Sequence, residues 1–226
     1  MNEYSFINCG KLGHLMSAAN ARQRRTAPRE KRRAQLVDAT MKCIARKGLG
    51  NTTLADVASE AGLSQGIINL HFESKDNLLK ETLSTLAGEY RDQFDRTLER
   101  AGKDPAIRLR ALMELDFRPS ICDRRKLAVW FAFWGEVKSR PTYRRMCDAW
   151  DRYYDEVIVG LCRDLVDDGR YAVEPVDAAN ALTSMTNGLW LTCLVSPKSF
   201  DRDRALAAVD SYLVHVFPEH FRERRP

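Results

Sequence analysis

The sequence lacks the long apolar runs and the reactive motifs by which many classes of protein are recognised. No stretch approaches the roughly 18 consecutive apolar residues of a membrane-spanning helix. The six cysteines include no CxxC pair and have no histidine pair near them, so neither a zinc site nor a disulfide framework is predicted. The four histidines are scattered, and neither a nucleophile–base pair nor a phosphate-cradling glycine loop occurs. We therefore expect no enzymatic activity, no cofactor and no metal site.

The first 27 residues show no helical apolar period. The segment MNEYSFINCGKLGHLMS lacks the compact apolar core of a signal peptide, so we expect a cytoplasmic protein. Residues 1–27 are predicted to form a disordered basic arm, within which we hypothesise that translation begins at Met16. Residues 17–33 hold too few large apolar side chains for a basic amphipathic helix, and no membrane partner is expected.

Positive charge is concentrated in the first third of the chain. Residues 1–75 contain 12 Lys and Arg against 6 Asp and Glu, whereas residues 76–226 contain 24 against 25. The net charge of +5 therefore arises entirely in the first part. This asymmetry indicates an acidic partner for that part, either nucleic acid or an anionic membrane surface.

Apolar residues recur at helical spacing along most of the chain, and no run alternates with period two for long enough to indicate a strand. The pattern predicts an all-α fold of about nine helices, separated by glycine and proline residues. Beyond the first third, the expected helices cover residues 123–139, 141–168, 175–196 and 201–217. The composition is sufficient for a sizeable core, in one domain or in two smaller ones.

The stretch TLADVASEAGLSQGIINLHFESKDNLL, residues 53–79, contains two helical patterns of about eight residues each, which are too short to be stable alone. Thr53 lies three residues before Asp56, the spacing of a capping box, and Ser64 suits the N-cap of the next helix. Gly62 between the two helices suits the positive φ of a tight turn. The pattern predicts a helix-turn-helix.

Three apolar residues fit the interior of that motif. Ala58 falls where the two helices cross and only a small side chain fits, while Leu63 and Ile68 fill the space between the helices. The second short helix would then be held by its neighbours as a rod that fits the major groove of double-stranded DNA.

The outward positions of this helix would face base edges. Gln65 and Asn69 can pair bidentately with adenine, Gly66 lets the backbone approach closely, and Leu70 lies on the same side. Flanking polar residues suit phosphate contacts. The residues expected to contact DNA are Thr53, Ser64, Gln65, Gly66, Asn69, Leu70, His71 and Lys75. Thr53 and Ser64 would also be helix caps in a protein without this function, and His71 could be an ordinary helix-end residue.

Residues 53–79 resemble the DNA-binding signature of the TetR family of regulators, preceded by its first helix, AQLVDATMKCIARKG. The resemblance implies a three-helix DNA-binding domain at residues 28–75. It also implies a larger helical ligand-binding and dimerisation bundle at residues 76–226. One departure is Asn69, because the family commonly has Tyr at this position, which usually touches DNA. The operator sequence is therefore not transferable from relatives.

Aromatic residues at helical spacing mark the C-terminal two-thirds, which holds all four tryptophans. Such stripes belong more often to a core than to a ligand site. Aromatic faces from several helices can nevertheless enclose an apolar or cationic ligand, a quaternary ammonium in particular. The residues expected to line a cavity are Trp130, Trp134, Trp150, Tyr153, Asn187 and Trp190. Glu136 and Asp116 could supply negative charge for a cation, although both are expected to be solvated.

The segments LAVWFAFWGEV, RRMCDAWDRYYDEVIVGLCRDL and TNGLWL are similar to the C-terminal domain of the BetI-type subgroup. The namesake of that subgroup represses glycine betaine synthesis genes and responds to choline. The resemblance implies a ligand-responsive repressor whose effector is choline or another quaternary ammonium compound. Two alternatives stay open: a ligand-independent DNA-binding protein with a filled helical core, and a TetR-type regulator for an unrelated apolar or aromatic ligand.

The last two predicted long helices carry apolar faces that could form a four-helix bundle with a second copy. A homodimer would bind a palindromic operator with its two recognition helices. These faces could also close the core of the single chain. They comprise Ala178, Leu182, Met185, Leu189 and Thr192 on one helix and Leu206, Val209, Leu213 and Val216 on the other.

Overall fold

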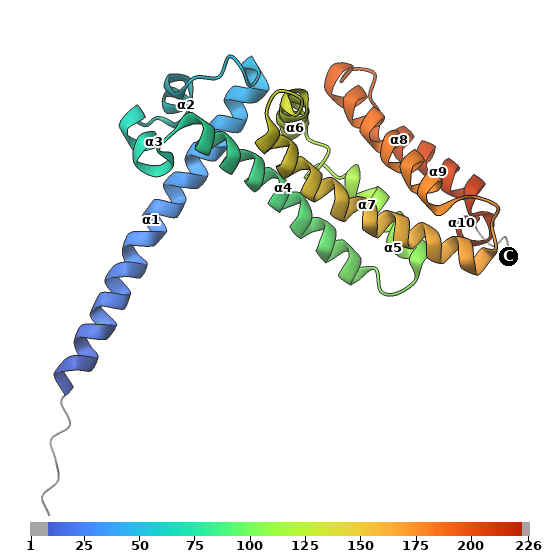
Figure 1. Ribbon diagram of the computed structural model, residues 1–226, viewed down its shortest axis with the longest axis horizontal. Coiled ribbons are helices and arrows are strands. Elements are labelled where there is room, and N and C mark those ends of the chain that lie inside the picture. Colours follow the sequence, from blue (N-terminus) through green and yellow to red (C-terminus); the bar gives the residue numbers. More distant parts are fainter. Residues whose placement is uncertain (1–8, 223–226) are drawn as a thin grey trace, which may run out of the picture.

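The computed structural model describes the backbone of residues 9–222 and the side chains of residues 28–222 except that of Trp150. Within this range the chain is entirely helical, with ten helices and no strand (Figure 1). The all-α prediction is confirmed. The short helix α10 at the C-terminal end was not anticipated. The helices are α1 (Cys9–Lys47), α2 (Leu54–Ala61), α3 (Gln65–Phe72), α4 (Lys75–Arg100), α5 (Pro105–Asp116), α6 (Arg124–Glu136), α7 (Pro141–Gly169), α8 (Pro175–Val195), α9 (Arg202–Val216) and α10 (Pro218–Phe221).

Helix α1 begins at Cys9, inside the segment for which a disordered arm is predicted. Residues 17–27 are rich in Ala and Arg, which favour helix. The helix runs through Pro28, although proline removes one intrahelical hydrogen bond. Residues 1–8 lie outside the described part, as do the side chains before Pro28. Disorder of the arm, translation from Met16 and the domain boundaries stay predictions.

The end of α1 packs with α2 and α3 around a small apolar core. Leu36 and Ile44 of α1, Val57 of α2 and Ile68 and Phe72 of α3 are all at most 3% exposed. Because α2 and α3 have only eight residues each, this shared core rather than helix propensity keeps them folded.

Helix α4 connects this three-helix unit to a second bundle of longer helices. It packs against α1 on one side and against α5, α6 and α7 on the other. Helices α7 and α8 pack together, α9 runs alongside α8, and the short α10 packs against α9 and α7 at the end of the bundle (Figure 1). None of the helices in the described range is long and apolar enough to cross a membrane.

Four of the nine residues named as a dimerisation face lie inside the protomer, which corrects that part of the sequence analysis. Ala178, Leu182, Val209 and Leu213 are at most 1% exposed, so they close the chain's own core. The pattern could not separate the two uses, because a helix between two packed layers shows apolar residues on more than one side. The exposed side of α8 carries small and apolar residues instead, namely Asn180, Ser184, Gly188, Leu191 and Val195.

Candidate DNA interface and ligand cavity

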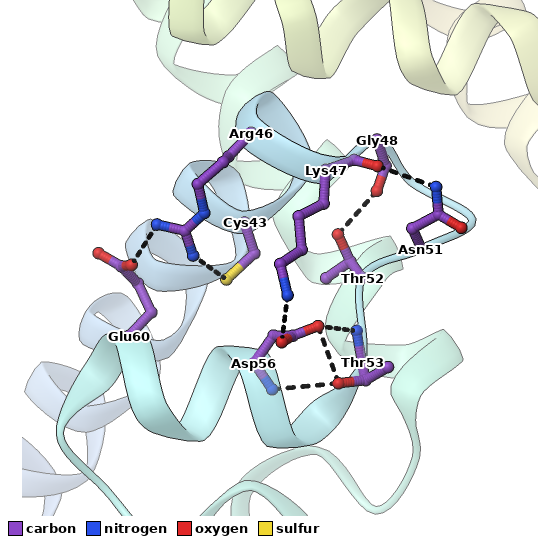
Figure 2. A network of polar contacts seen from close by, with 9 residues as sticks. All are labelled: Cys43, Arg46, Lys47, Gly48, Asn51, Thr52, Thr53, Asp56 and Glu60. Atoms are coloured by element: carbon purple, nitrogen blue, oxygen red, sulfur yellow. Dashed lines mark hydrogen bonds and ion pairs between the residues drawn. The ribbon is translucent and has the colours of Figure 1, made fainter.

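A network of polar contacts fixes the start of α2 (Figure 2). The Thr53 hydroxyl oxygen accepts a hydrogen bond from the Asp56 backbone N–H at 3.1 Å, and Asp56 Oδ2 accepts one from the Thr53 backbone N–H at 3.0 Å. This is a complete capping box, as predicted. Lys47 Nζ of α1 lies 2.6 Å from Asp56 Oδ1, and these hydrogen bonds from Lys47 and Thr53 lower the pKa of Asp56 to about 2. The cap thus also holds α2 to α1.

The turn between α2 and α3 has the geometry expected of a helix-turn-helix. Gly62 has φ 64° and ψ 34°, a left-handed conformation that glycine adopts without strain. The Leu63 N–H donates to the Ala58 carbonyl at 2.9 Å, which closes the end of α2. Ala58 and Ile68 are 5% and 1% exposed, and Leu63 packs partly buried beside them. The three predicted interior positions are therefore inside the motif.

The predicted base-facing residues form the open side of α3. Gln65, Gly66, Asn69 and Leu70 are all exposed, and Leu70 reaches 72%. In Figure 1, α3 lies at the outer edge of the molecule, away from α8 and α9. Ser64 occupies the N-cap position but its hydroxyl makes no cap hydrogen bond, so both this hydroxyl and the first N–H groups of α3 can meet a phosphate.

His71 lies where α3 meets α1. Arg33 Nη1 donates to the His71 carbonyl at 2.5 Å, its guanidinium lies 4.4 Å from the centroid of the Phe72 ring, and its Nη2 lies 3.2 Å from Glu81 Oε2. Burial, and then the charges of Arg29, Arg33 and Arg32, lower the pKa of His71. A neutral His71 can still donate one N–H bond to a phosphate. Lys75 begins α4, where Ser74 caps the helix by accepting from the Asn77 N–H at 3.1 Å.

A cavity of about 190 Å³ lies in the second bundle. Trp130, Trp134, Asn187 and Trp190 line it, so four of the six residues named from the sequence meet at one place. The side chain of Trp150 lies outside the described part. The cavity is smaller than the roughly 300 to 1,000 Å³ of a common ligand site. Six further lining residues were not named as such from the sequence: Tyr90, Asp151, Tyr154, Asp155, Thr183 and Thr186.

Tyr153 does not line this cavity. Its hydroxyl donates to Asp95 of α4, and the Arg91 guanidinium lies 4.6 Å from the centroid of its ring. Tyr153 and Tyr154 are neighbours on α7, so their side chains point about 100° apart around the helix. Tyr154 therefore takes the place at the cavity that the sequence spacing suggested for Tyr153.

Asp116 is fully buried, which corrects the expectation that it is solvated. It accepts hydrogen bonds from the hydroxyls of Tyr90 and Tyr154, and its backbone carbonyl accepts the Trp190 indole N–H at 2.8 Å. Burial raises the pKa of Asp116 to about 7, although the two tyrosine hydrogen bonds oppose that shift. Asp116 thus fixes three aromatic side chains of the cavity wall. Glu136 lies instead at the end of α6, 3.6 Å from Arg140.

Two carboxylates of α7, Asp151 and Asp155, face the cavity at i, i+4 spacing. Neither forms an ion pair within the described residues. Burial, and then the charges of Asp155 and Asp148, raise the pKa of Asp151 to about 6, and burial also raises the pKa of Asp155. In the sequence these two residues are part of the acidic residues of α7, and acidic residues on a helix usually form a solvated face.

The chemistry of the cavity wall therefore suits an organic cation. Asp116 accepts hydrogen bonds from the polar groups of Tyr90, Tyr154 and Trp190, so their aromatic rings can face a ligand. Asp151 and Asp155 supply negative charge. Aromatic side chains attract cations electrostatically, and carboxylates add to that attraction. Among the described residues, no group of three or more His, Cys, Asp or Glu side chains is placed to hold a metal ion.

Two family models match the chain. Residues 36–82 match the model described as bacterial regulatory proteins of the tetR family, and residues 105–218 match the model of the C-terminal domain of BetI-type transcriptional repressors. Among curated proteins, the HTH-type transcriptional regulator BetI of Paraburkholderia xenovorans is 34% identical over 185 residues, which cover 82% of this chain and 93% of that one. BetI of Paraburkholderia phymatum is 36% identical, with 82% and 92% covered.

Solved structures agree with this fold. A transcriptional regulator from Pseudomonas aeruginosa PAO1 superimposes with a TM-score of 0.74 at 29% identity, covering 85% of this chain and 95% of that one. A regulator from Saccharomonospora viridis, solved in complex with choline, superimposes with a TM-score of 0.74 at 24% identity, covering 82% and 97%. Each of these four proteins is described as a transcriptional regulator.

Proposed function

Because the chain belongs to the TetR family of transcriptional regulators, with a BetI-type C-terminal domain, we propose that it is a repressor released from DNA by an organic cation. The observation that carries the effector class is the cavity in the second bundle, with Asp151 and Asp155 among its aromatic walls. The repressor acts as a homodimer on a palindromic operator in the cytoplasm.

The DNA contacts divide into base readers and phosphate ligands. The exposed side of α3 enters the major groove with Gln65, Gly66, Asn69 and Leu70. The phosphate contacts come from the residues at the ends of the short helices, namely Thr53, Ser64, His71 and Lys75. The Thr53 hydroxyl and backbone N–H are both bonded to Asp56, so a phosphate contact by Thr53 exchanges one of these hydrogen bonds.

The effector is of the quaternary ammonium class, with choline as the first candidate. A cavity of about 190 Å³ admits a small cation but not a large drug-like molecule. Asp151 and Asp155 attract a cation, and a neutral aromatic ligand would leave both carboxylates uncompensated. The choline complex of the S. viridis regulator, a protein of the same fold, supports this choice.

The dimer forms through the exposed sides of α8 and α9. On α8 this side includes Ser184, Gly188 and Leu191, and on α9 it includes Ala207 and Ala208, all of them exposed in the protomer. Small residues let two helices approach closely, and the exposed apolar residues gain from burial. Twofold symmetry then sets the two α3 helices on the two halves of a palindrome.

The effector shifts an equilibrium between a DNA-binding state and a released state. A cation in the cavity draws α7 toward the aromatic residues of α6, and both helices contact α4, which carries the DNA-binding domain. Helix α4 then tilts and changes the distance between the two α3 helices of the dimer. The shift can be only as large as the difference in effector affinity between the two states.

A ligand-independent protein with a filled core is the second candidate, and the cavity argues against it. The two are separated by measuring the affinity of full-length protein for a selected operator fragment with and without choline, betaine aldehyde and tetramethylammonium. We expect at least one cation to weaken DNA binding about fivefold or more, the lower end of allosteric couplings. A complex unaffected by any cation that binds the protein would refute the switch.

A further inference from the structure

The exposed side of α3 has a composition that bears on which bases it can read. It carries two amides, one bare backbone position and one large apolar side chain, and the helix QGIINLHF contains neither Arg nor Lys. We propose that α3 recognises A·T base pairs, with Leu70 in contact with the 5-methyl group of thymine and Asn69 or Gln65 paired with adenine. This inference rests on the proposed role of α3 as the base reader.

Leu70 has no role in the protein's own packing that would account for it. At 72% exposed it is the most exposed large apolar residue of the described chain, while Ile68 and Phe72 on the opposite side of α3 are 1% and 3% exposed. The exposed apolar residues of α8 have a proposed partner in the second protomer, whereas α3 faces DNA. The thymine methyl is the apolar group that base pairs present in the major groove.

Gly66 also lacks a role in the protein's own fold. A Cβ atom built at Gly66 would meet only the Ser64 Oγ, at 3.7 Å, and its φ is not positive, so the fold does not require glycine there. In a helix the side chain at i+4 leans back toward residue i, so Leu70 leans toward Gly66. The two residues form one shallow apolar spot that a methyl group from outside can enter.

The amides beside this spot are available for bases. Gln65 and Asn69 are exposed, and their side chains form no hydrogen bond with the rest of the described chain. An amide pairs bidentately with N6 and N7 of adenine. Because adenine and thymine occupy one base pair or neighbouring pairs, an amide and Leu70 can read both strands of an A·T step.

The usual reader of guanine is missing from α3. Guanine is read by Arg or Lys, which donate to O6 and N7. The nearby Arg33 donates a hydrogen bond to the His71 carbonyl and forms an ion pair with Glu81. Its guanidinium lies over the Phe72 ring. Burial and the neighbouring arginines lower the pKa of His71 and so disfavour its charged form. The face therefore lacks the cationic side chains that usually read guanine, whereas its amides match adenine.

The test begins with selection of binding sites from a random DNA library by the full-length protein. We expect a palindrome with A·T pairs at the positions under α3. Replacing one of these thymines in each half-site by deoxyuridine removes only the methyl group. It should weaken wild-type binding about fourfold per half-site, the value for burying one methyl group.

The variant Leu70→Ala should bind the thymine and deoxyuridine operators equally, so the two changes are not additive. Ile107→Ala, a variant of an exposed apolar residue of α5, is the matched control and should retain the full thymine preference. A selected palindrome with G·C pairs under α3, or an undiminished deoxyuridine effect in Leu70→Ala, would overturn the inference but leave the repressor function intact. Failure to select any palindrome would refute the proposed function and this inference with it.

Discussion

Arg125 at the start of α6 forms an ion pair with Asp38 of α1, with 3.3 Å between Nη1 and Oδ1. Helix α6 also carries Trp130 and Trp134 of the cavity wall, and α1 holds α2 and α3 through the shared core. One helix therefore touches both the ligand cavity and the DNA-binding domain. We therefore expect a displacement of α6 to act on α1 directly, in addition to any path through α4.

Arg125→Ala should weaken the coupling between effector and operator. Both charges are about two-fifths exposed, so we expect little change in stability and near-normal binding of each ligand alone. The factor by which the effector weakens DNA binding should fall about threefold, near the lower end of the range for residues that modulate coupling. Affinity for the operator, measured by fluorescence anisotropy with and without the effector, gives this factor. Arg96→Ala, which removes a similar exposed ion pair with Asp92 on α4, is the control and should leave it unchanged.

Cation binding should strengthen as pH rises from 5 to 7. The pKa of Asp151 is raised to about 6, chiefly by burial, so the carboxylate is mostly protonated at pH 5 and mostly charged at pH 7. The charged fraction of Asp151 rises about tenfold across this interval, so we expect about a tenfold gain in affinity by calorimetry. Asp151→Asn should bind weakly and show a flattened pH profile. Asp148→Asn, outside the cavity wall, should keep a pH-dependent affinity with its midpoint at lower pH, because the charge of Asp148 helps to raise the pKa of Asp151. An unchanged profile in Asp151→Asn would contradict the assignment.

Asp116 should make the protein less stable as pH rises from about 4 to about 7. Its folded-state pKa is raised to about 7 by burial, against roughly 4 when unfolded, so between these values the folded chain binds more protons. Stability therefore falls with rising pH in this window. In thermal unfolding from pH 5 to pH 8, Asp116→Asn should gain stability relative to wild type. Parallel curves would show that Asp116 does not titrate there.

Gly188→Leu should give a folded monomer. A Cβ atom at this exposed position of α8 meets nothing within 4 Å in the protomer, so the larger side chain is tolerated by the single chain but blocks close approach of a partner helix. Light scattering after size exclusion should show the mass of one chain, and operator affinity should fall about a hundredfold with the loss of bivalent binding. Gly88→Leu, at an exposed glycine of α4 with equally open surroundings, should stay dimeric. A dimeric Gly188→Leu would place the interface elsewhere.

The DNA-binding unit could be predicted in detail because its information is local. The capping box of Thr53 and Asp56 and the left-handed turn at Gly62 are decided by residues within a few positions of one another. The exposure of Gln65 and Leu70 follows from the period of a single helix. Such features depend only on residues within one or two helical turns of each other. The resemblance to the family adds the order in which the helices follow one another.

The sequence by itself thus determined the helical class, the helix-turn-helix and the gathering of aromatic residues in the second bundle. Tertiary structure alone decided that Asp116 of α5 is buried beneath Tyr90 and Tyr154, that Tyr154 rather than Tyr153 lines the cavity, and that Leu182 closes the protomer's own core. The physical reason is that a helix presents several faces of similar composition. Which face meets a neighbour depends on how helices distant in the chain pack, and the burial that shifts the pKa of Asp116 exists only after that packing.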